Sequence, residues 1–285
     1  MSEIKWPDNL IEELTFRRCI FFLGSGVSAS SVADDGTRPQ TWGEFLTNAQ
    51  KLLVNPSGSD KRFIKDMLKE KNYLLALQAI NDLADPGAYT AFLRKSFNNP
   101  IFKPSELHNC IRDIDCKIVM TTNFDKIYDN LCNDTGYVVC NYQETSKIIS
   151  NIKTSNRLII KAHGTIDDTD QIVFTQKDYY NAKAKFPQFY ELMKALFLTN
   201  TVVFLGYSLN DPDINLILES VSNSTNSGCP HYVVTSKAHD HMKKYWQESY
   251  NISCLEYGDD HNELLVNLKN LQSRIESERK CRGMW

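Results

Sequence analysis

The chain has 285 residues, a formal net charge of −3, and a composition that is 42% hydrophobic and 24% charged. These values suit one large folded domain, or one domain that carries an insertion. A slightly acidic chain has no general attraction to nucleic acids or acidic membranes, so direct binding to either is not expected. The sequence has no run of 18 apolar residues to predict a membrane span, and its polar start lacks the apolar core of a signal peptide.

Eight cysteines are scattered along the chain, and none belongs to a CxxC pair. Thiols distributed in this way indicate a reducing, cytoplasmic environment rather than a disulfide framework. A zinc ribbon needs closely spaced pairs of ligands, and these are missing. The sequence therefore predicts no metal site.

Short apolar runs alternate with segments of helical periodicity along most of the chain. Nearly continuous hydrophobic runs are typical of strands that are buried on both faces. Their alternation with helices predicts an α/β fold with a doubly wound, Rossmann-like and mostly parallel sheet. The expected strands are 19–23, 117–121, 137–140, 158–162, 201–205, 231–235 and 252–257, with a further short strand at 172–175.

The segment from about 41 to 105 has a different pattern, because apolar residues recur in it at helical spacing without a clear strand. We interpret it as a helical module inserted between the first and second strands of one domain that spans residues 1–285. A row of leucines predicts a C-terminal helix at about 261–277. A loose tail is expected from 278 onward.

The first strand runs directly into a glycine-containing turn, Gly24-Ser25-Gly26, followed by Val27 and Ser28. Glycine permits tight turning and close approach of the backbone to a ligand, and free N–H groups at a following helix start can hold a pyrophosphate. The match to GxGxxG is incomplete. A plain turn between strand and helix remains the alternative.

The second strand is followed by Thr122-Asn123-Phe124-Asp125. Ligands of open parallel sheets bind beyond the carboxyl ends of the strands, where Asn123 can orient water or a hydroxyl and Asp125 can accept from a ribose. The alternative is that both side chains only cap the next helix.

A third strand end carries His163-Gly164. An imidazole can take a proton from a ribose hydroxyl or from water near neutral pH. A lone histidine at a strand end is also often structural, and that alternative stays open.

The fourth strand end is Gly206-Tyr207-Ser208-Leu209-Asn210. Ser208 and Asn210 supply a hydroxyl and an amide for a ribose or a phosphate. The alternative is a simple turn before a helix that Asp211 caps and Pro212 begins.

Glycine, asparagine, histidine and serine thus follow four apolar runs, in positions that one crevice can collect. The ordered motifs, 24–28, 122–125, 163–164 and 206–208, resemble the sirtuin NAD-binding core. They look most similar to the sirtuin-like domains of bacterial antiphage defence proteins. The resemblance covers about residues 18–257.

This resemblance implies that NAD is the substrate and assigns roles by position. The catalytic residues would be Asn123, which positions water or ribose, His163, the general base, and Asp125, which holds ribose and stabilises positive charge. The cofactor-binding residues would be Gly24, Ser25, Gly26, Ser28, Thr122, Gly206, Ser208 and Asn210.

One departure from the wider family narrows the implied function. Deacylating sirtuins carry a zinc module with two cysteine pairs after the His-Gly motif, whereas residues 165–200 contain no cysteine. The resemblance therefore implies no zinc and favours the defence branch, whose members hydrolyse NAD to nicotinamide and ADP-ribose in abortive infection. A protein deacylase or ADP-ribosyltransferase, and a non-catalytic module that binds NAD or ADP-ribose, are the alternatives.

An unrestrained NAD hydrolase would poison its host, so the resemblance also implies control by assembly. Family members are fused to a sensor or work with a separate protein, such as a helicase-like ATPase or an Argonaute-like protein. We expect a homo-oligomer with a separately encoded sensor or ATPase partner, or a chain that is one domain of a longer protein.

Overall fold

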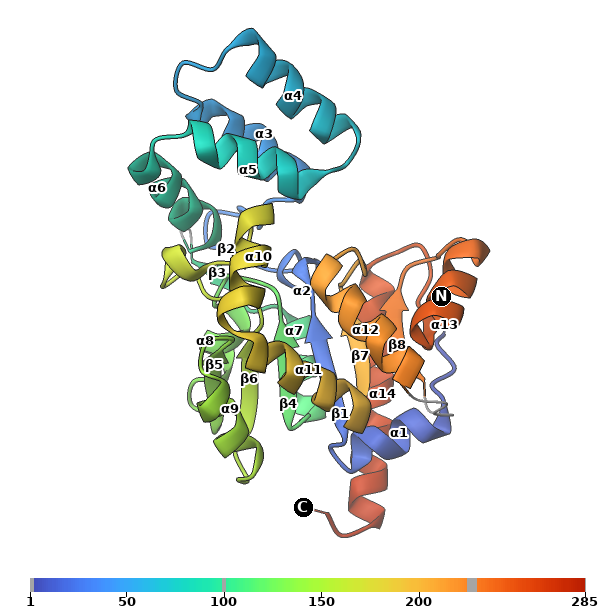
Figure 1. The fold of residues 1–285 in the computed structure, drawn as a ribbon. Coiled ribbons are helices and arrows are strands. Elements are labelled where there is room, and N and C mark those ends of the chain that lie inside the picture. Colours follow the sequence, from blue (N-terminus) through green and yellow to red (C-terminus); the bar gives the residue numbers. More distant parts are fainter. Residues whose placement is uncertain (1–2, 99–100, 225–229, 285) are drawn as a thin grey trace.

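The computed structural model describes residues 3–98, 101–224 and 230–284. Its centre is a seven-stranded, all-parallel sheet in the order β5-β6-β4-β1-β7-β8-β9 (Figure 1), which confirms the predicted α/β class. The strands are β1 (Cys19–Leu23), β4 (Ile118–Thr121), β5 (Tyr137–Asn141), β6 (Arg157–Lys161), β7 (Thr201–Leu205), β8 (His231–Thr235) and β9 (Ile252–Glu256). Every strand lies within about one residue of its predicted run.

Helices cover both faces of the sheet because successive strand residues point to opposite sides. Ile20 and Phe22 of β1 join one core, while Phe21 and Leu23 join the other. The first core is closed by α9 (Thr145–Ile152), α10 (Gln176–Lys185), α11 (Pro187–Thr199), α12 (Pro212–Ser224) and α13 (Asp240–Tyr250). The second is closed by α1 (Asp8–Thr15), α7 (Glu106–Ile114), α8 (Ile127–Cys132) and α14 (Asn262–Cys281).

A helical module stands above the carboxyl ends of the strands (Figure 1). It consists of α3 (Trp42–Ala49), α4 (Gly58–Lys69), α5 (Tyr73–Leu83) and α6 (Pro86–Phe97), together with the short turn η1 (Gln50–Leu52). The side chains of Thr41, Ser57, Asn72 and Asp85 accept hydrogen bonds from the first turns of these helices, which fixes where each helix begins. A small antiparallel pair, β2 (Val32–Ala33) and β3 (Phe102–Lys103), flanks the module, and the sequence analysis missed it.

The predicted strand at 172–175 is wrong. This segment follows a short turn, η2 (Thr169–Gln171), and has no strand pairing apart from a backbone hydrogen bond from Val173 N to His163 O. The apolar side chains of Ile172 and Phe174 instead enter the core of the module. Burial against helices explains the apolar run as well as a strand would.

The expected loose tail from 278 is also wrong, since α14 continues to Cys281. Arg279 is buried, and its guanidinium donates to the carbonyl oxygens of Leu14 (2.7 Å), Ile114 (2.9 Å) and Thr15 (3.1 Å). These carbonyls belong to α1 or α7, so one side chain ties the last helix to two others.

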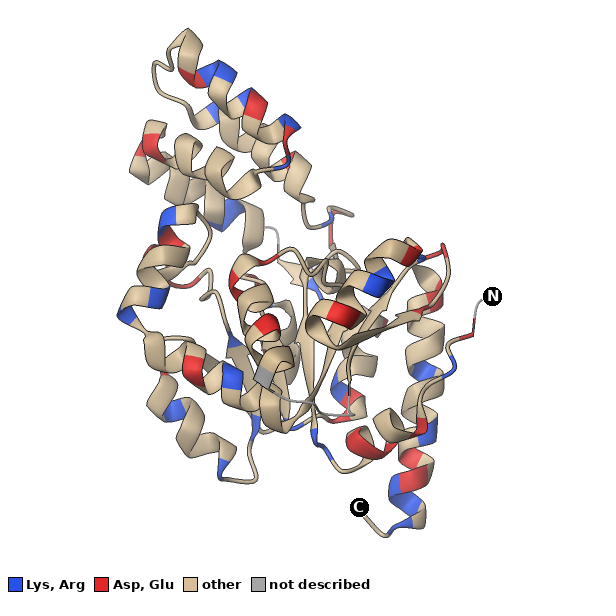
Figure 2. Ribbon diagram, turned by 45° about the vertical axis from the view of Figure 1, so that its right-hand side comes forward, with Lys and Arg blue, Asp and Glu red and all other residues tan. Residues whose placement is uncertain are grey.

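Charges of both signs are interspersed over the helices (Figure 2), in keeping with the small net charge of the chain. Of the helices that the structure describes, none combines the length and apolarity needed to cross a membrane.

We predict that Arg279→Ala lowers the free energy of unfolding by about 3 kcal/mol, because it leaves the carbonyl oxygens of Thr15 and Ile114 without their side-chain donor. Arg282→Ala is the control, since Arg282 is exposed and its guanidinium makes surface contacts with the carboxylate of Glu278 and the ring of Phe16; its effect should stay within about 1 kcal/mol. Urea denaturation measures both. Equal effects of the two substitutions would contradict the anchoring role.

Acid should destabilise the fold through His231. Burial lowers the pKa of this imidazole to about 4, and its Nδ1 accepts the N–H of Val202 (3.1 Å). The unfolded state binds this proton near pH 6.5, so the contribution is complete above about 6.5 and disappears as the pH falls towards 4. We expect a loss of roughly 3 kcal/mol over this window, with His108 adding a similar slope. His231→Asn should flatten urea-denaturation stability against pH; an unchanged slope would contradict the assignment.

Candidate functional site

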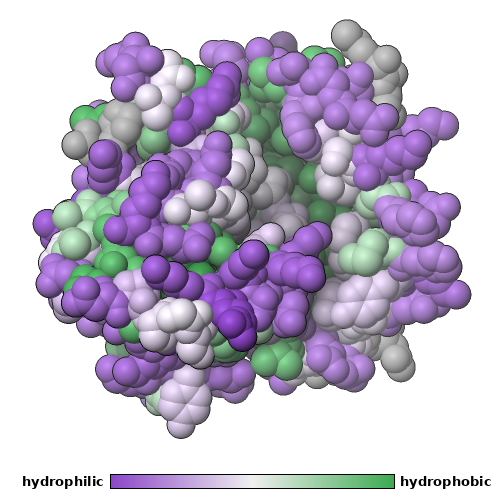
Figure 3. Space-filling model, turned by 90° about the horizontal axis from the view of Figure 1, so that it is seen from above, coloured by the Kyte–Doolittle hydropathy of each residue, from purple (hydrophilic) through white to green (hydrophobic). Residues whose placement is uncertain are grey.

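The predicted site residues follow neighbouring strands at one edge of the sheet. The chain passes from β1 to β4 on one side and from β7 to β8 on the other, so β1 and β7 flank the point where the winding direction changes. In open α/β sheets, ligands bind beyond the carboxyl ends of the strands at such a point. Seen from above, the surface there is hollowed near its centre, with apolar residues inside the hollow (Figure 3).

The turns after β1 and β7 touch backbone to backbone. Gly24 N donates to Leu205 O and Gly26 N donates to Gly206 O, both at 2.9 Å. A Cβ on Gly26 would lie 2.9 Å from the Cα of Gly206, and one on Gly206, whose φ is +58°, would lie 2.5 Å from Val27 N. The glycines are therefore required by the contact between two turns. The N–H groups of Gly24 and Gly26 are thus engaged in hydrogen bonds within the protein.

Asn123 links the second strand end to the glycine turn. Its amide nitrogen donates to Gly24 O and to Ser28 Oγ, both at 2.9 Å. Thr121 Oγ1 supports it from below, accepting from Asn123 N (3.0 Å) and donating to Leu23 O (2.8 Å). The amide oxygen of Asn123 has no protein partner among the described residues, so it remains available to a ligand.

Asp125 combines the two roles that the sequence left open. Its Oδ1 accepts from Ile127 N (3.1 Å) at the start of α8, which is the capping role. Its Oδ2 accepts from Ser28 Oγ (2.7 Å), which ties it to the glycine turn. A carboxylate retains further lone pairs after two hydrogen bonds, so Asp125 can still accept from a ligand.

His163 is held at the end of β6 by two other elements. Its Nε2 lies 3.3 Å from Oδ2 of Asp211, and its ring meets the ring of Tyr179 edge to face, with 5.1 Å between centroids. Both His163 and Asp211 are nearly buried, with side chains 7% and 8% exposed. Asp211 also caps α12, because its Oδ1 accepts from Asp213 N and Ile214 N.

A buried ion pair beneath the site escaped the sequence analysis. Lys161, the last residue of β6, lies 3.2 Å from Oδ2 of Asp129 and donates to the backbone oxygen of Asp125 (2.5 Å). Burial raises the pKa of Asp129, and the ammonium of Lys161 opposes that shift. In the sequence, this ion pair is indicated by a lysine that ends an otherwise apolar run. Lys161 thereby fixes the backbone that carries Asp125.

Three of the predicted cofactor-binding residues also lie at the carboxyl ends of the strands, but they are not part of the hydrogen-bond network that joins Asn123 and Asp125 to the glycine turn. Thr122 directly follows β4, while Ser208 and Asn210 are exposed on the turn after Gly206. No hydrogen bond within the described ranges connects the three side chains to the glycine turn. Their role in binding NAD stays a prediction.

The aromatic ring of Phe124 leaves this network and enters the core of the helical module. It meets Phe97 of α6 and Phe174 edge to face, with centroids 5.3 Å and 4.7 Å apart. Phe174 also contacts Phe45 of α3 (5.2 Å). The module is therefore packed on the two segments that follow Asn123 and His163.

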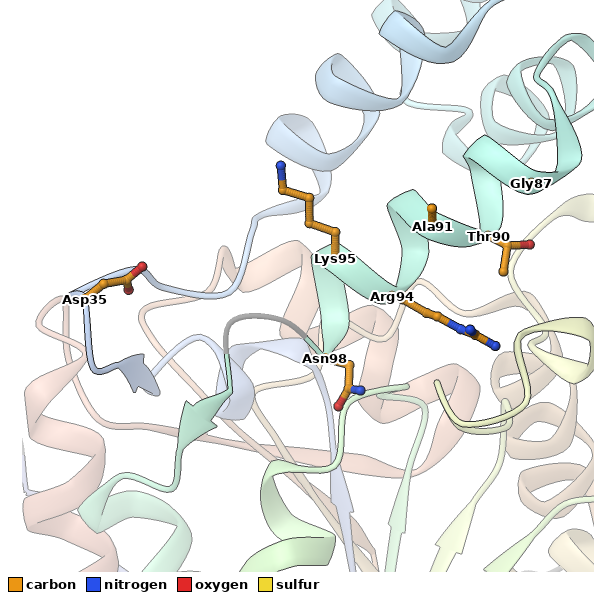
Figure 4. Close-up of a pocket in the computed structure, with 7 residues that line it drawn as sticks. All are labelled: Asp35, Gly87, Thr90, Ala91, Arg94, Lys95 and Asn98. Atoms are coloured by element: carbon orange, nitrogen blue, oxygen red, sulfur yellow. The ribbon is translucent and has the colours of Figure 1, made fainter.

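A cavity of about 730 Å³ lies beside α6 (Figure 4) and is not lined by the predicted site residues. Its walls are Asp35 and one helix face that comprises Gly87, Thr90, Ala91, Arg94, Lys95 and Asn98. We assign the candidate site to the strand ends, because side chains that follow β1, β4, β6 and β7 lie there, where ligands of open parallel sheets bind. Across residues 3–98, 101–224 and 230–284, no group of three or more His, Cys, Asp or Glu side chains could hold a metal ion.

The parallel sheet, the glycine turn and the strand-end histidine define a Rossmann-like α/β domain. Residues 117–255 match the model of the SIR2-like domain family. The chain therefore carries a SIR2-like domain. The matched segment includes Asn123, Asp125, His163 and Gly206, whereas the glycine turn after β1 precedes it.

Curated relatives support the same assignment. Defense-associated sirtuin 2 of Bacillus subtilis is 29% identical over 210 residues, which are 72% of this chain and 19% of that protein. NAD(+) hydrolase ThsA of Enterococcus faecium is 30% identical over 139 residues, or 47% of this chain and 28% of the relative. ThsA of Acinetobacter baumannii is 23% identical over 119 residues, or 42% and 25%. The matches thus span less than a third of these relatives' length.

We predict that Gly24→Ala lowers the free energy of unfolding by about 2–4 kcal/mol, because the new Cβ would collide with the backbone of Gly206 and Tyr207. Gly43→Ala is the matched control: it lies in α3 with nothing within 4 Å of the added Cβ, and it should be neutral or slightly stabilising. Chemical denaturation measures both. A neutral Gly24→Ala would show that the two turns separate easily.

Proposed function

We propose that this protein hydrolyses NAD to nicotinamide and ADP-ribose. The observation that carries the proposal is the convergence of the glycine turn, Asn123 and His163 at the ends of the adjacent strands β1, β4 and β6 within a SIR2-like domain. Relatives named as NAD(+) hydrolases support NAD as the substrate.

The chemistry follows from the groups at these strand ends. Cleavage of the bond between nicotinamide and ribose develops positive charge on the sugar, as in other glycoside hydrolyses. The carboxylate of Asp125 stabilises that charge and accepts from a ribose hydroxyl. Water adds to the anomeric carbon, neutral nicotinamide departs, and the proton lost by the water passes to His163.

Asn123 has two tasks in this scheme. Its amide nitrogen holds Gly24 O and Ser28 Oγ, and so keeps the glycine turn in place. Its amide oxygen, which lacks a protein partner in the described ranges, orients the attacking water or the ribose. A single side chain thereby couples the position of the turn to the position of the nucleophile.

The relative named as a defence-associated sirtuin supports a role for this activity in defence. We propose that the enzyme works as a homo-oligomer under the control of a separately encoded sensor or ATPase partner. Assays of fractions separated by size, with and without the co-expressed neighbouring genes, test this assembly. Full activity in an isolated monomer fraction would exclude it.

The decisive measurement is nicotinamide release from NAD by the wild type, Asn123→Ala and His163→Ala. We expect each substitution to lower the rate by about 10²–10⁴-fold, because it removes the water-orienting oxygen or the general base. His239→Ala is the control, since His239 is exposed and lies at the start of α13, outside the site. It should leave the rate unchanged.

Two results would argue against the proposal. One is NAD binding without nicotinamide release under any activating condition, which favours a binding module. The other is turnover that strictly requires an acylated lysine or a protein acceptor, which favours a deacylase or an ADP-ribosyltransferase.

A further inference from the structure

Asp211 joins three elements at the candidate site. It precedes α12, its Oδ2 lies 3.3 Å from Nε2 of His163 at the end of β6, and the same oxygen accepts from the hydroxyl of Tyr179 in α10 (2.6 Å). Its other oxygen, Oδ1, accepts two backbone N–H groups at the start of α12, at 3.0 Å each. The carboxylate therefore has little freedom to move.

The other ring nitrogen of His163 is in a different situation. No hydrogen bond from the described protein residues reaches Nδ1, although the ring as a whole is nearly buried. One nitrogen is thus paired with a fixed carboxylate, and the other is open to a ligand. In a neutral imidazole one nitrogen donates and the other accepts, and the partner of the first decides which is which.

We propose that Asp211 is a positioning residue that holds His163 as the Nε2–H tautomer, and so makes Nδ1 the atom that accepts the proton. A carboxylate only accepts hydrogen bonds, so it selects the tautomer whose proton lies on the nitrogen facing it. It also stabilises the imidazolium that forms when Nδ1 takes up a proton. Tyr179 keeps the selecting oxygen in place.

The titratable side chains around His163 leave Asp211 as its main electrostatic partner. Tyr179 and Tyr207 stay neutral, because burial raises the pKa of each phenol well above its ordinary value. Burial likewise raises the pKa of Asp213, while a hydrogen bond with Tyr190 and interactions with Lys183 and His163 oppose that shift. Asp211 is therefore the acceptor in direct contact with the imidazole.

The substitution Asp211→Asn tests this role sharply. Asparagine is as good an N-cap as aspartate, so its side-chain oxygen can keep the hydrogen bonds of Oδ1 at the start of α12. The amide nitrogen then replaces Oδ2 and presents N–H groups to Nε2. His163 can accept that hydrogen bond only as the other tautomer, with its proton on Nδ1.

The readout is the tautomer of His163, followed by long-range ¹H–¹⁵N NMR spectra of histidine-labelled protein at about pH 8, where an ordinary imidazole is neutral. His163→Gln identifies the signal among the six histidines. We expect the Nε2–H form in the wild type and the Nδ1–H form in Asp211→Asn. Asp260→Asn is the matched control, because Asp260 also accepts a backbone N–H at a helix start but is exposed; it should leave the tautomer of His163 unchanged.

A second, kinetic test of the role of Asp211 rests on the proposed NAD hydrolysis. Asp211→Asn should lower kcat for nicotinamide release by about 10²-fold or more with little change in KM, because Nδ1 no longer accepts a proton. Tyr179→Phe, which keeps the ring but loses the hydroxyl, should lower kcat less.

The NMR measurement and the kinetic measurement test different claims, so one can contradict its claim without the other. An Nδ1–H tautomer in the wild type, or the same tautomer in wild type and folded Asp211→Asn, would overturn the inference. If Asp211→Asn does not fold, an Nδ1–H tautomer in the wild type would still overturn the inference. Absence of nicotinamide release from the wild type would count against the proposed function and would leave the tautomer result standing.

Discussion

The contact between the turns after β1 and β7 is the constraint on which the site depends. Gly26 and Gly206 approach so closely that neither has room for a side chain. Asn123 then reaches the carbonyl of Gly24 from the neighbouring strand, and Ser28 reaches Asp125. A shift in either turn would therefore displace the groups that we assign to water and ribose.

Polar side chains near this contact hold the other residues of the site in position. Lys161 supports the backbone of Asp125 from a buried position, and Asp211 pairs with His163 while capping α12. Each of these side chains therefore has a structural role at the candidate site. Asp125 itself accepts from Ile127 N and from Ser28 Oγ, so the capping interpretation and a role in ligand binding do not exclude each other.

The sequence predicted the sheet well, because parallel strands buried on both faces leave continuous apolar runs that are hard to mistake. It failed at 172–175, where apolar residues are buried against helices without pairing as a strand, and at Arg279, whose partners are backbone oxygens far away in the chain. Such pairings leave no local pattern. The strand-end motifs could be recognised because each directly follows one of these apolar runs. The pairing of His163 with Asp211, by contrast, becomes apparent only in the folded structure.

The rings of Phe124 and Phe174 connect the helical module to the segments that carry the candidate site. Each ring sits within the aromatic core of the module, yet each belongs to a segment that leads directly from a strand end of the site. A tilt of the module would therefore move the backbone around Asn123 and the loop beyond His163. A protein that docks on the module would thereby change the geometry of the candidate site without contacting the strand ends themselves.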